Sequence, residues 1–398
     1  MKLKRILLAA AAASVLSGGA AVADSTGITD TSIKIGNTNP YSGPASAYSV
    51  IGKAISAYFK ELNTEGGING RTIEFISLDD GYSPPRTVQQ VRKLVEKEKI
   101  AFLFQSLGTP TNSAIHKYMN QKKVPQLFVA TGASKWGQPE KYPWTMGFQP
   151  TYDVEGEIYA KYVLENVENP KIAVLFQNDD YGKDYRDGFL RGLGDKKDLI
   201  VSMLPYETTD PTVDSQILAL KDSGANVFVN ISIPKFAAQA IRKACEIDWK
   251  PLHLLNNVSS SVSATLKPAG LECSKDLITA QWMKDPTDPQ WKGTAGYQEW
   301  SAWMDKNLPD ADRGDVNYGL GYNVSKLLHH VLDNCEDMTR AGIMACAANV
   351  KDLELPMVLP GILVNTSPTD FYPIQAAQLS KFDGEKWALF GSVIDATK

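Results

Sequence analysis

The sequence predicts an α/β protein made of two successive units, each a parallel β-sheet with helices on both faces. Short runs rich in β-branched and aromatic residues alternate with stretches in which apolar residues recur at helical spacing. This alternation occurs twice, with a passage near residues 148–152 between the two series. Such an order is typical of parallel sheets, and 398 residues suffice for two or three domains with their own cores.

The first unit begins with a strand and ends with a strand. Residues 72–78 alternate apolar and polar side chains, and residues 100–104 form an apolar run. Pro84-Pro85 opens a helix in which Val88, Val91, Leu94 and Val95 recur at helical spacing. The expected order is strand 32–36, helix 50–62, a glycine-rich turn at 66–70, strand 72–78, helix 84–95, strand 100–104, helix 113–121 and strand 125–129.

The second unit repeats the pattern and is followed by a helical region and a hairpin. We expect helix 153–165, strand 172–176, helix 182–193, strand 199–205, helix 213–221, strand 227–231, helix 235–247, and strands 252–255 and 277–281. Residues 291–350 are mostly helical in pattern. Two strands, 374–381 and 386–390, flank Asp383-Gly384 and predict a terminal hairpin.

Residues 1–23 have the pattern of a secretory signal peptide. Lys2, Lys4 and Arg5 precede a short apolar run at 6–16, and Ala21-Val22-Ala23 forms an A-x-A cleavage motif. We therefore expect cleavage after Ala23 and export to the periplasm. Loss of the three positive charges changes the formal net charge from −4 to −7, which argues against nucleic acid and anionic membranes as partners.

The four cysteines favour disulfide bonds, because an exported protein meets an oxidising compartment. Three pairings are possible. Cys335 and Cys346 bracket a short turn, so we expect this pair to be bonded, and by remainder Cys245 with Cys273. A metal site is disfavoured, because the sequence has no Cys-x-x-Cys and nothing near His330 completes a ligand set.

The loops that follow the predicted strands are the candidate binding region, because parallel sheets bind ligands at the carboxyl ends of their strands. These loops are rich in Ser, Thr, Asn, Gly and Tyr. They comprise residues 39–48, 105–112, 130–134, 178–182, 230–234 and 256–259.

Two of these loops suit a negatively charged group. Thr109-Pro110, after Gly108, predicts a helix start with Thr109 as the N-cap, and the amides of a first helical turn attract carboxylates. Thr131, Gly132 and Ala133 are small and polar, so an anion can approach their backbone closely. The alternatives are that Thr109 only caps its own helix and that residues 131–133 form a plain turn.

Tyr48 and Tyr181 each lie in a loop that leads into a helix. An aromatic ring with a hydroxyl tip suits the wall of a pocket, and structural packing is the alternative.

We find no G-x-S-x-G, Walker A, H-E-x-x-H or G-x-G-x-x-G motif. The sequence therefore predicts a binding protein rather than an enzyme, with no catalytic residue, cofactor or metal.

Several segments together resemble the Leu/Ile/Val-binding family of periplasmic solute-binding proteins. They are Ile35-Gly36, Tyr41-Ser42-Gly43-Pro44, Asn63 with the turn at 66–70, Asp79-Asp80, and the run at 178–182 that contains Tyr181-Gly182. The resemblance implies a type I periplasmic binding fold, in which two doubly wound α/β lobes are joined by a three-segment hinge. It places residues 24–149 and 282–370 in the N-terminal lobe, and 150–281 and 371–398 in the C-terminal lobe.

The same resemblance implies a monomer that traps a small molecule by hinge closure and delivers it to the membrane permease of an ABC importer. It implies that Tyr48 flanks the ligand, that Gly108 and Thr109 hold its carboxylate, that residues 131–133 add amides and a hydroxyl, and that Tyr181 contacts it from the other lobe.

One position departs from the family pattern. Amino-acid binders carry an acid after the strand near 252–256 to pair with the ligand ammonium, whereas this chain has Asn256-Asn257-Val258. An unpaired buried ammonium costs several kcal/mol. We therefore expect a carboxylate with an apolar or aromatic body, such as a plant-derived hydroxycinnamate or benzoate. The alternatives are a branched-chain amino acid held by Asn257, a sensory subunit, and a periplasmic hydrolase.

Overall fold

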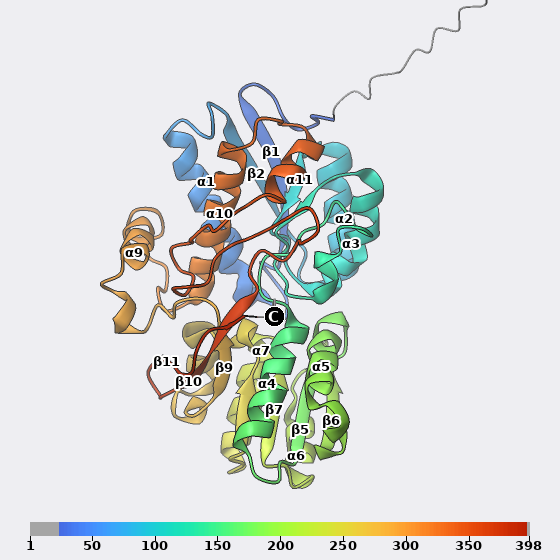
Figure 1. The fold of residues 1–398 in the computed structure, drawn as a ribbon, viewed down its shortest axis with the longest axis vertical. Helices are drawn as coiled ribbons and strands as arrows, with labels where there is room; N and C mark the ends of the chain where they lie inside the picture. The colour runs from blue at the N-terminus through green and yellow to red at the C-terminus, as the bar shows by residue number, and fades with distance from the viewer. Residues whose placement is uncertain (1–23, 396–398) are drawn as a thin grey trace, which may run out of the picture.

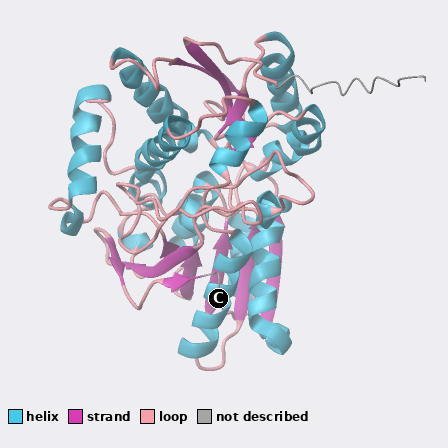
Figure 2. Ribbon diagram, turned by 45° about the horizontal axis from the view of Figure 1, so that its top comes forward, coloured by secondary structure: helices cyan, strands magenta, loops and turns pink. Residues whose placement is uncertain are grey.

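The computed structural model describes residues 24–395 as two α/β lobes, one above the other in Figure 1. The predicted signal peptide, 1–23, lies outside the described residues. None of the helices in the described part of the chain is both long enough and apolar enough to cross a bilayer. Each lobe contains one of the two sheets. The loops gather in the band between the two sheets (Figure 2).

The first lobe is built on a parallel sheet with strand order β2-β1-β3-β4. Ile33 and Ile35 of β1 are fully buried, and α1 presents Ile51, Ile55 and Phe59 to the core at helical spacing. Its elements are β1 (Ser32–Asn39), α1 (Ser49–Thr64), β2 (Thr72–Asp79), α2 (Pro84–Arg92), β3 (Phe102–Phe104), α3 (Thr109–Lys122) and β4 (Gln126–Leu127).

The second lobe is built on a larger sheet with order β11-β10-β9-β8-β7-β5-β6. The neighbouring strands β6, β5, β7, β8 and β9 run parallel to one another. Strand β5 is buried along its whole length, as expected of an apolar strand covered on both faces. Its first elements are α4 (Tyr152–Asn166), β5 (Ile172–Gln177), α5 (Asp180–Leu193), β6 (Ile200–Tyr206), α6 (Asp214–Asp222), β7 (Val227–Ile231), α7 (Pro234–Glu246), β8 (Leu252–Leu255), α8 (Lys267–Ala269) and β9 (Ile278–Gln281).

The chain then returns to the first lobe before it ends in the second. After β9 come α9 (Ala295–Asn307), α10 (Val316–Asp333) and α11 (Arg340–Ala347), and then β10 (Ala376–Phe382), β11 (Trp387–Leu389) and β12 (Ile394–Asp395). Helix α10 packs closely on α1, since a Cβ at Gly321 would lie 2.7 Å from the Cβ of Ala54. Strands β10 and β11 are antiparallel and extend the second sheet, which confirms the predicted hairpin.

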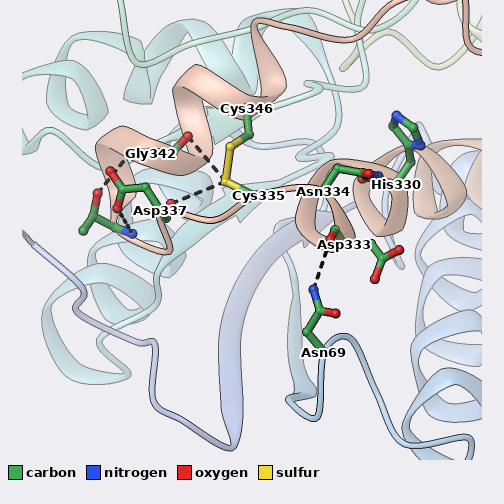
Figure 3. The surroundings of a disulfide bond; sticks show 9 residues. Asn69, His330, Asp333, Asn334, Cys335, Asp337, Gly342 and Cys346 are labelled. Carbon is green, nitrogen blue, oxygen red and sulfur yellow. Dashed lines mark hydrogen bonds between the residues drawn. A yellow bond between two sulfur atoms is a disulfide. The ribbon is translucent and has the colours of Figure 1, made fainter.

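The alternating strand–helix order and the parallel sheets confirm the predicted fold class. The two predicted disulfides are also present, Cys245–Cys273 and Cys335–Cys346. Figure 3 shows the second of these between the end of α10 and helix α11, with the carbonyl of Asp337 3.4 Å from the Cys335 sulfur. This bond closes the predicted turn and fixes α11 to the end of α10.

Candidate functional site

A cavity lies between the two lobes. Its wall contains residues from loops of the first lobe, from loops of the second lobe, from the connections near residues 149–152 and 281–283, and from α10. The aromatic members of the wall are Tyr48, Tyr82, Tyr152, Tyr181 and Trp282, and the polar members are Thr109, Gln149, Asn257, Ser260, Gln281 and Asn317. The remaining members are Gly108, Ala130 and aliphatic residues or methionine, so no charged side chain of the described chain lines this cavity.

The tyrosine side of the wall is a packed aromatic cluster. Tyr152 stacks on Tyr185 with ring centroids 4.5 Å apart and meets Tyr181 edge to face at 5.3 Å. The Tyr181 hydroxyl accepts a 2.9 Å hydrogen bond from Asn256 Nδ2. Burial raises the pKa of the Tyr181 hydroxyl well above its ordinary value, so the group stays protonated and neutral.

Five of the predicted site residues lie in the cavity wall: Tyr48, Gly108, Thr109, Tyr181 and Asn257. Thr131, Gly132 and Ala133 lie behind it. The Thr131 hydroxyl is 2.5 Å from the Thr109 hydroxyl, and the Gly132 carbonyl accepts the amide of Tyr152. The 131–133 segment therefore supports the wall from outside in this structure.

Thr131 lies in a small hydrogen-bond cluster behind the wall. Its Oγ1 accepts the indole N–H of Trp136 and the backbone amide of Ala133, both at 3.3 Å, and it also interacts with the Tyr152 hydroxyl. Either hydroxyl of the Thr109–Thr131 pair can be the donor. When Thr131 donates, the proton of Thr109 is free to point into the cavity.

The helix start at Thr109 differs by one residue from the prediction. Helix α3 has Gly108 as its N-cap, with a φ of 99°, and Thr109 is the first helical residue. The carbonyl of Gly108 accepts the amide and the side-chain amide of Asn112. The prediction that Thr109 is the N-cap was wrong. The N-cap position of α3 has a positive φ, which glycine adopts without strain, and it is occupied by Gly108. The side chain of Thr109 is thereby available to the cavity.

Asn257 is held by three hydrogen bonds on the second-lobe side. Its backbone N–H donates to Glu155 Oε1 at 2.7 Å. Its side-chain Oδ1 accepts the Trp282 indole N–H at 2.9 Å, and its side-chain Nδ2 lies 3.4 Å from Gln281 Oε1. Glu155 is buried behind the wall and also accepts the hydroxyls of Tyr159 and Tyr185. Burial raises the pKa of Glu155 to about 7. This carboxyl group therefore already accepts three hydrogen bonds within the lobe.

Sequence reasoning missed several wall residues, among them Tyr82, Gln149, Tyr152 and Trp282. Tyr82 follows β2, at the same sheet edge as the other binding loops, so the rule that ligands bind at strand ends would have found it. Gln149, Tyr152 and Trp282 lie on connections between the lobes. A connection has no strand–loop–helix pattern of its own, so no local signal identifies these residues.

Asp179 and Asp180 are adjacent but serve different structural roles. Asp179 is the N-cap of α5 and accepts the amides of Tyr181 and Gly182. Asp180 pairs with Lys135 of the first lobe. Asp179 therefore caps a helix and Asp180 forms an ion pair, and the two carboxylates do not converge on one point. Among the described residues no cluster of His, Cys, Asp and Glu has the arrangement of a metal site.

Two lobes with an aromatic, uncharged cavity between them define a ligand-binding protein of the two-lobed type. A family model described as "Periplasmic binding protein" matches residues 32–386, and the chain belongs to this family. Among curated relatives, Leu/Ile/Val-binding protein homolog 7 of Brucella suis biovar 1 (strain 1330) is 24% identical over 298 residues, which cover 72% of this chain and 71% of that protein.

Solved structures share the type I fold at low sequence identity. A branched-chain amino acid ABC transporter protein from Thermus thermophilus, with bound valine, has a TM-score of 0.81 and 14% identity and covers 92% of this chain and 97% of its own. A fatty acid ABC transporter substrate-binding protein from Thermomonospora curvata has a TM-score of 0.76 and 20% identity and covers 94% of each chain. The family and the fold are those of binding proteins, and this chain is a periplasmic ligand-binding protein.

Proposed function

We propose that the protein captures a small carboxylate with an apolar or aromatic body and passes it, as a monomer, to the permease of an ABC importer. Aromatic acids such as hydroxycinnamates or benzoates fit this description. The observation that carries the proposal is the cavity wall, which combines five aromatic side chains with neutral polar groups and no charged side chain. Aromatic rings pack favourably on such walls.

The carboxylate would lie at the Thr109 end of the cavity. With Thr131 as the donor in their shared hydrogen bond, the Thr109 hydroxyl would have its proton free for a ligand, and the first turn of α3 contributes the positive end of a helix. We propose Tyr48, Gly108, Thr109, Tyr181 and Asn257 as direct contacts and Thr131, Gly132 and Ala133 as the supporting segment. Capture would occur by closure of lobes comprising 24–149 with 282–370 and 150–281 with 371–398.

A branched-chain amino acid is the second candidate, and it is favoured by the name of the Brucella suis relative. Its weakness is the ammonium group. Glu155, the carboxyl group bonded to Asn257, is outside the wall and accepts three hydrogen bonds from the protein. A ligand ammonium in the cavity would therefore be left without a negative partner.

The deciding experiment is a calorimetric titration with 4-hydroxycinnamate, benzoate, leucine and phenylalanine. We expect binding of an aromatic acid and no measurable heat from the amino acids. Thermal unfolding with each compound provides an independent readout, since ligand at one hundred times Kd stabilises a protein by about 2.7 kcal/mol. Tight leucine binding with no response to either aromatic acid would reject the proposal in favour of the amino-acid alternative.

A further inference from the structure

Tyr82 is a buried tyrosine of the cavity wall, and residues of the first lobe hold it in place. It lies between β2 and α2, and its φ of 59° is a left-handed conformation that a bulky residue adopts at an energetic cost. Asp80 Oδ1 accepts the backbone amide of Tyr82 at 2.9 Å, and Asp80 Oδ2 accepts the Thr87 hydroxyl at 2.8 Å. A Cβ at Gly108 would lie 2.5 Å from Cε2 of Tyr82, so the ring needs a glycine beside it. The ring therefore lies against the start of α3.

The hydrogen bonds around Tyr82 leave its proton without an acceptor in the protein. Gln177 Nε2 lies 3.5 Å from the Tyr82 hydroxyl oxygen and 2.5 Å from Asp179 Oδ2. A carboxylate only accepts hydrogen bonds, so the amide nitrogen of Gln177 is the atom that faces Asp179. The amide oxygen of Gln177 accepts the Tyr206 hydroxyl at 2.9 Å. Tyr82 therefore accepts from Gln177, and no acceptor among residues 24–395 lies within hydrogen-bond distance for the Tyr82 proton.

Tyr181 of the second lobe has the same arrangement. The backbone amide of Ser232 donates to Asn256 Oδ1 at 3.1 Å, which fixes the side chain of Asn256 so that its NH2 group faces Tyr181. The Tyr181 hydroxyl accepts from this group, and its own proton has no acceptor within hydrogen-bond distance in the described chain. Burial raises the pKa of both the Tyr82 and Tyr181 hydroxyls well above the ordinary value, so both keep their protons.

The two tyrosines belong to opposite lobes and line the same cavity. Tyr82 follows β2 in the upper lobe of Figure 1, and Tyr181 lies in the first turn of α5 in the lower lobe. Tyr82 is 6% exposed and Tyr181 is 2% exposed. Polar groups at this degree of burial are normally hydrogen-bonded, and these two O–H groups donate to nothing in the protein. A ligand group that only accepts hydrogen bonds would satisfy both protons.

We propose that Tyr82 and Tyr181 donate their hydroxyl protons to the ligand carboxylate, so that one phenol from each lobe holds the anion without a cationic side chain. This inference rests on the proposed function, because it takes the ligand to be a carboxylate. A carboxylate has two oxygens and no proton to donate, which matches two free donors. Because the donors come from different lobes, the carboxylate is fully bonded only when the lobes are closed.

The test is a calorimetric titration of the full chain and of two variants with benzoate, 4-hydroxycinnamate, leucine and benzamide. Tyr82→Phe and Tyr181→Phe each remove a hydroxyl and keep the ring. Each variant is expected to bind the acid about ten- to a hundredfold more weakly, because it loses a hydrogen bond to a charged group. Benzamide has an uncharged amide in place of the carboxylate, so the preference of the parent protein for benzoate over benzamide is expected to shrink in both variants.

Tyr58→Phe is the matched control. It also removes a buried tyrosine hydroxyl of the first lobe, but that hydroxyl bonds to His329 and not to the cavity, so affinity is expected to stay that of the parent protein. Thermal unfolding without ligand checks that the variants keep the fold.

The outcomes separate this inference from the proposed function. If leucine is the only acid that binds and both cavity variants weaken it, the tyrosine pair stands and the proposed aromatic ligand fails. If an aromatic acid binds but Tyr82→Phe or Tyr181→Phe binds it as tightly as the parent protein, the proposed ligand stands and the tyrosine pair is overturned. A preference for benzoate over benzamide that is unchanged in both variants also overturns the pair. Binding of none of the acids overturns both proposals.

Discussion

The hydroxyl of Tyr48 donates a 2.9 Å hydrogen bond to the carbonyl of Val258, and this bond joins the two lobes beside the cavity. Both residues also line the cavity. A single side chain therefore forms part of the ligand wall and part of the contact that holds the lobes together. We therefore expect Tyr48 to link occupancy of the cavity to closure of the lobes.

Tyr48→Phe removes this bond and keeps the ring. We expect the closed state to lose about 1 kcal/mol, which raises Kd for the ligand roughly fivefold. Calorimetric titration measures the change. Tyr58→Phe is the control, because the Tyr58 hydroxyl bonds to His329 within the first lobe. Equal affinities of Tyr48→Phe and the parent protein would show that the Tyr48–Val258 bond does not contribute to ligand binding.

Thr109→Ala removes the hydroxyl that we propose donates to the ligand carboxylate. A hydrogen bond to a charged group is worth about 1.5–3 kcal/mol, so affinity for a carboxylate is expected to fall about ten- to a hundredfold. Thr109→Ser keeps the hydroxyl and is expected to bind within a few-fold of the parent protein. If Thr109→Ala binds benzoate or 4-hydroxycinnamate unchanged, the carboxylate lies elsewhere.

Thr131→Ala tests whether Thr131 supports the cavity wall or contacts the ligand directly. This change removes the hydrogen-bond partner of the Thr109 hydroxyl and leaves Thr109 in the wall. We expect a smaller loss of affinity than for Thr109→Ala, and little further loss when both changes are combined. A double-mutant cycle measures this coupling. Fully additive losses would show that Thr131 contacts the ligand independently.

Glu155 makes stability depend on pH. Its pKa is raised from 4.5 to about 7 in the folded protein, so the folded state binds the proton more tightly than the unfolded state. The resulting stabilisation is complete below pH 4.5 and is lost as pH rises through 7; it amounts to about 3 kcal/mol. Glu155→Gln is expected to remove this dependence.

Urea unfolding at pH values from 5 to 8 measures the effect as the difference between parent and variant. The difference is needed because His116 and His253, whose pKa values are lowered by burial to about 4 and about 3, contribute with the opposite sign. Glu157→Gln, a half-exposed residue of the same helix that pairs with Arg191, is the control. Parallel pH profiles for the parent protein and Glu155→Gln would contradict the prediction.

The Cys335–Cys346 bond closes a loop of 11 positions, and its removal by Cys335→Ser with Cys346→Ser is expected to cost about 3 kcal/mol. The Cys245–Cys273 bond closes a longer loop, of 28 positions, so its removal is expected to cost slightly more. Denaturant unfolding of the two double variants compares these costs. Peptide mapping without reduction checks both pairings, and free thiols in the exported protein would refute them.

Local sequence patterns predicted most of the fold and part of the site. Alternating apolar runs and helical spacing depend on neighbouring residues, so β5, α5 and the terminal hairpin could be placed from the sequence. The position of the helix cap at Gly108 could not be predicted, because Thr109-Pro110 is an equally good helix start by residue preference. Tyr152 and Trp282 reach the cavity only through the path of the connections between the lobes, and that path is a tertiary property.

The packing of α10 on α1 has a consequence for folding. Tyr58 of α1 and His329 of α10 are hydrogen-bonded although they are 271 positions apart. The face of α1 that contains Ala54 and Tyr58 therefore stays uncovered until nearly the whole chain is available, and contacts of such long sequence separation form slowly. A chain that stops before Val316 would keep this face exposed, and we expect such a fragment to aggregate rather than to form an isolated first lobe.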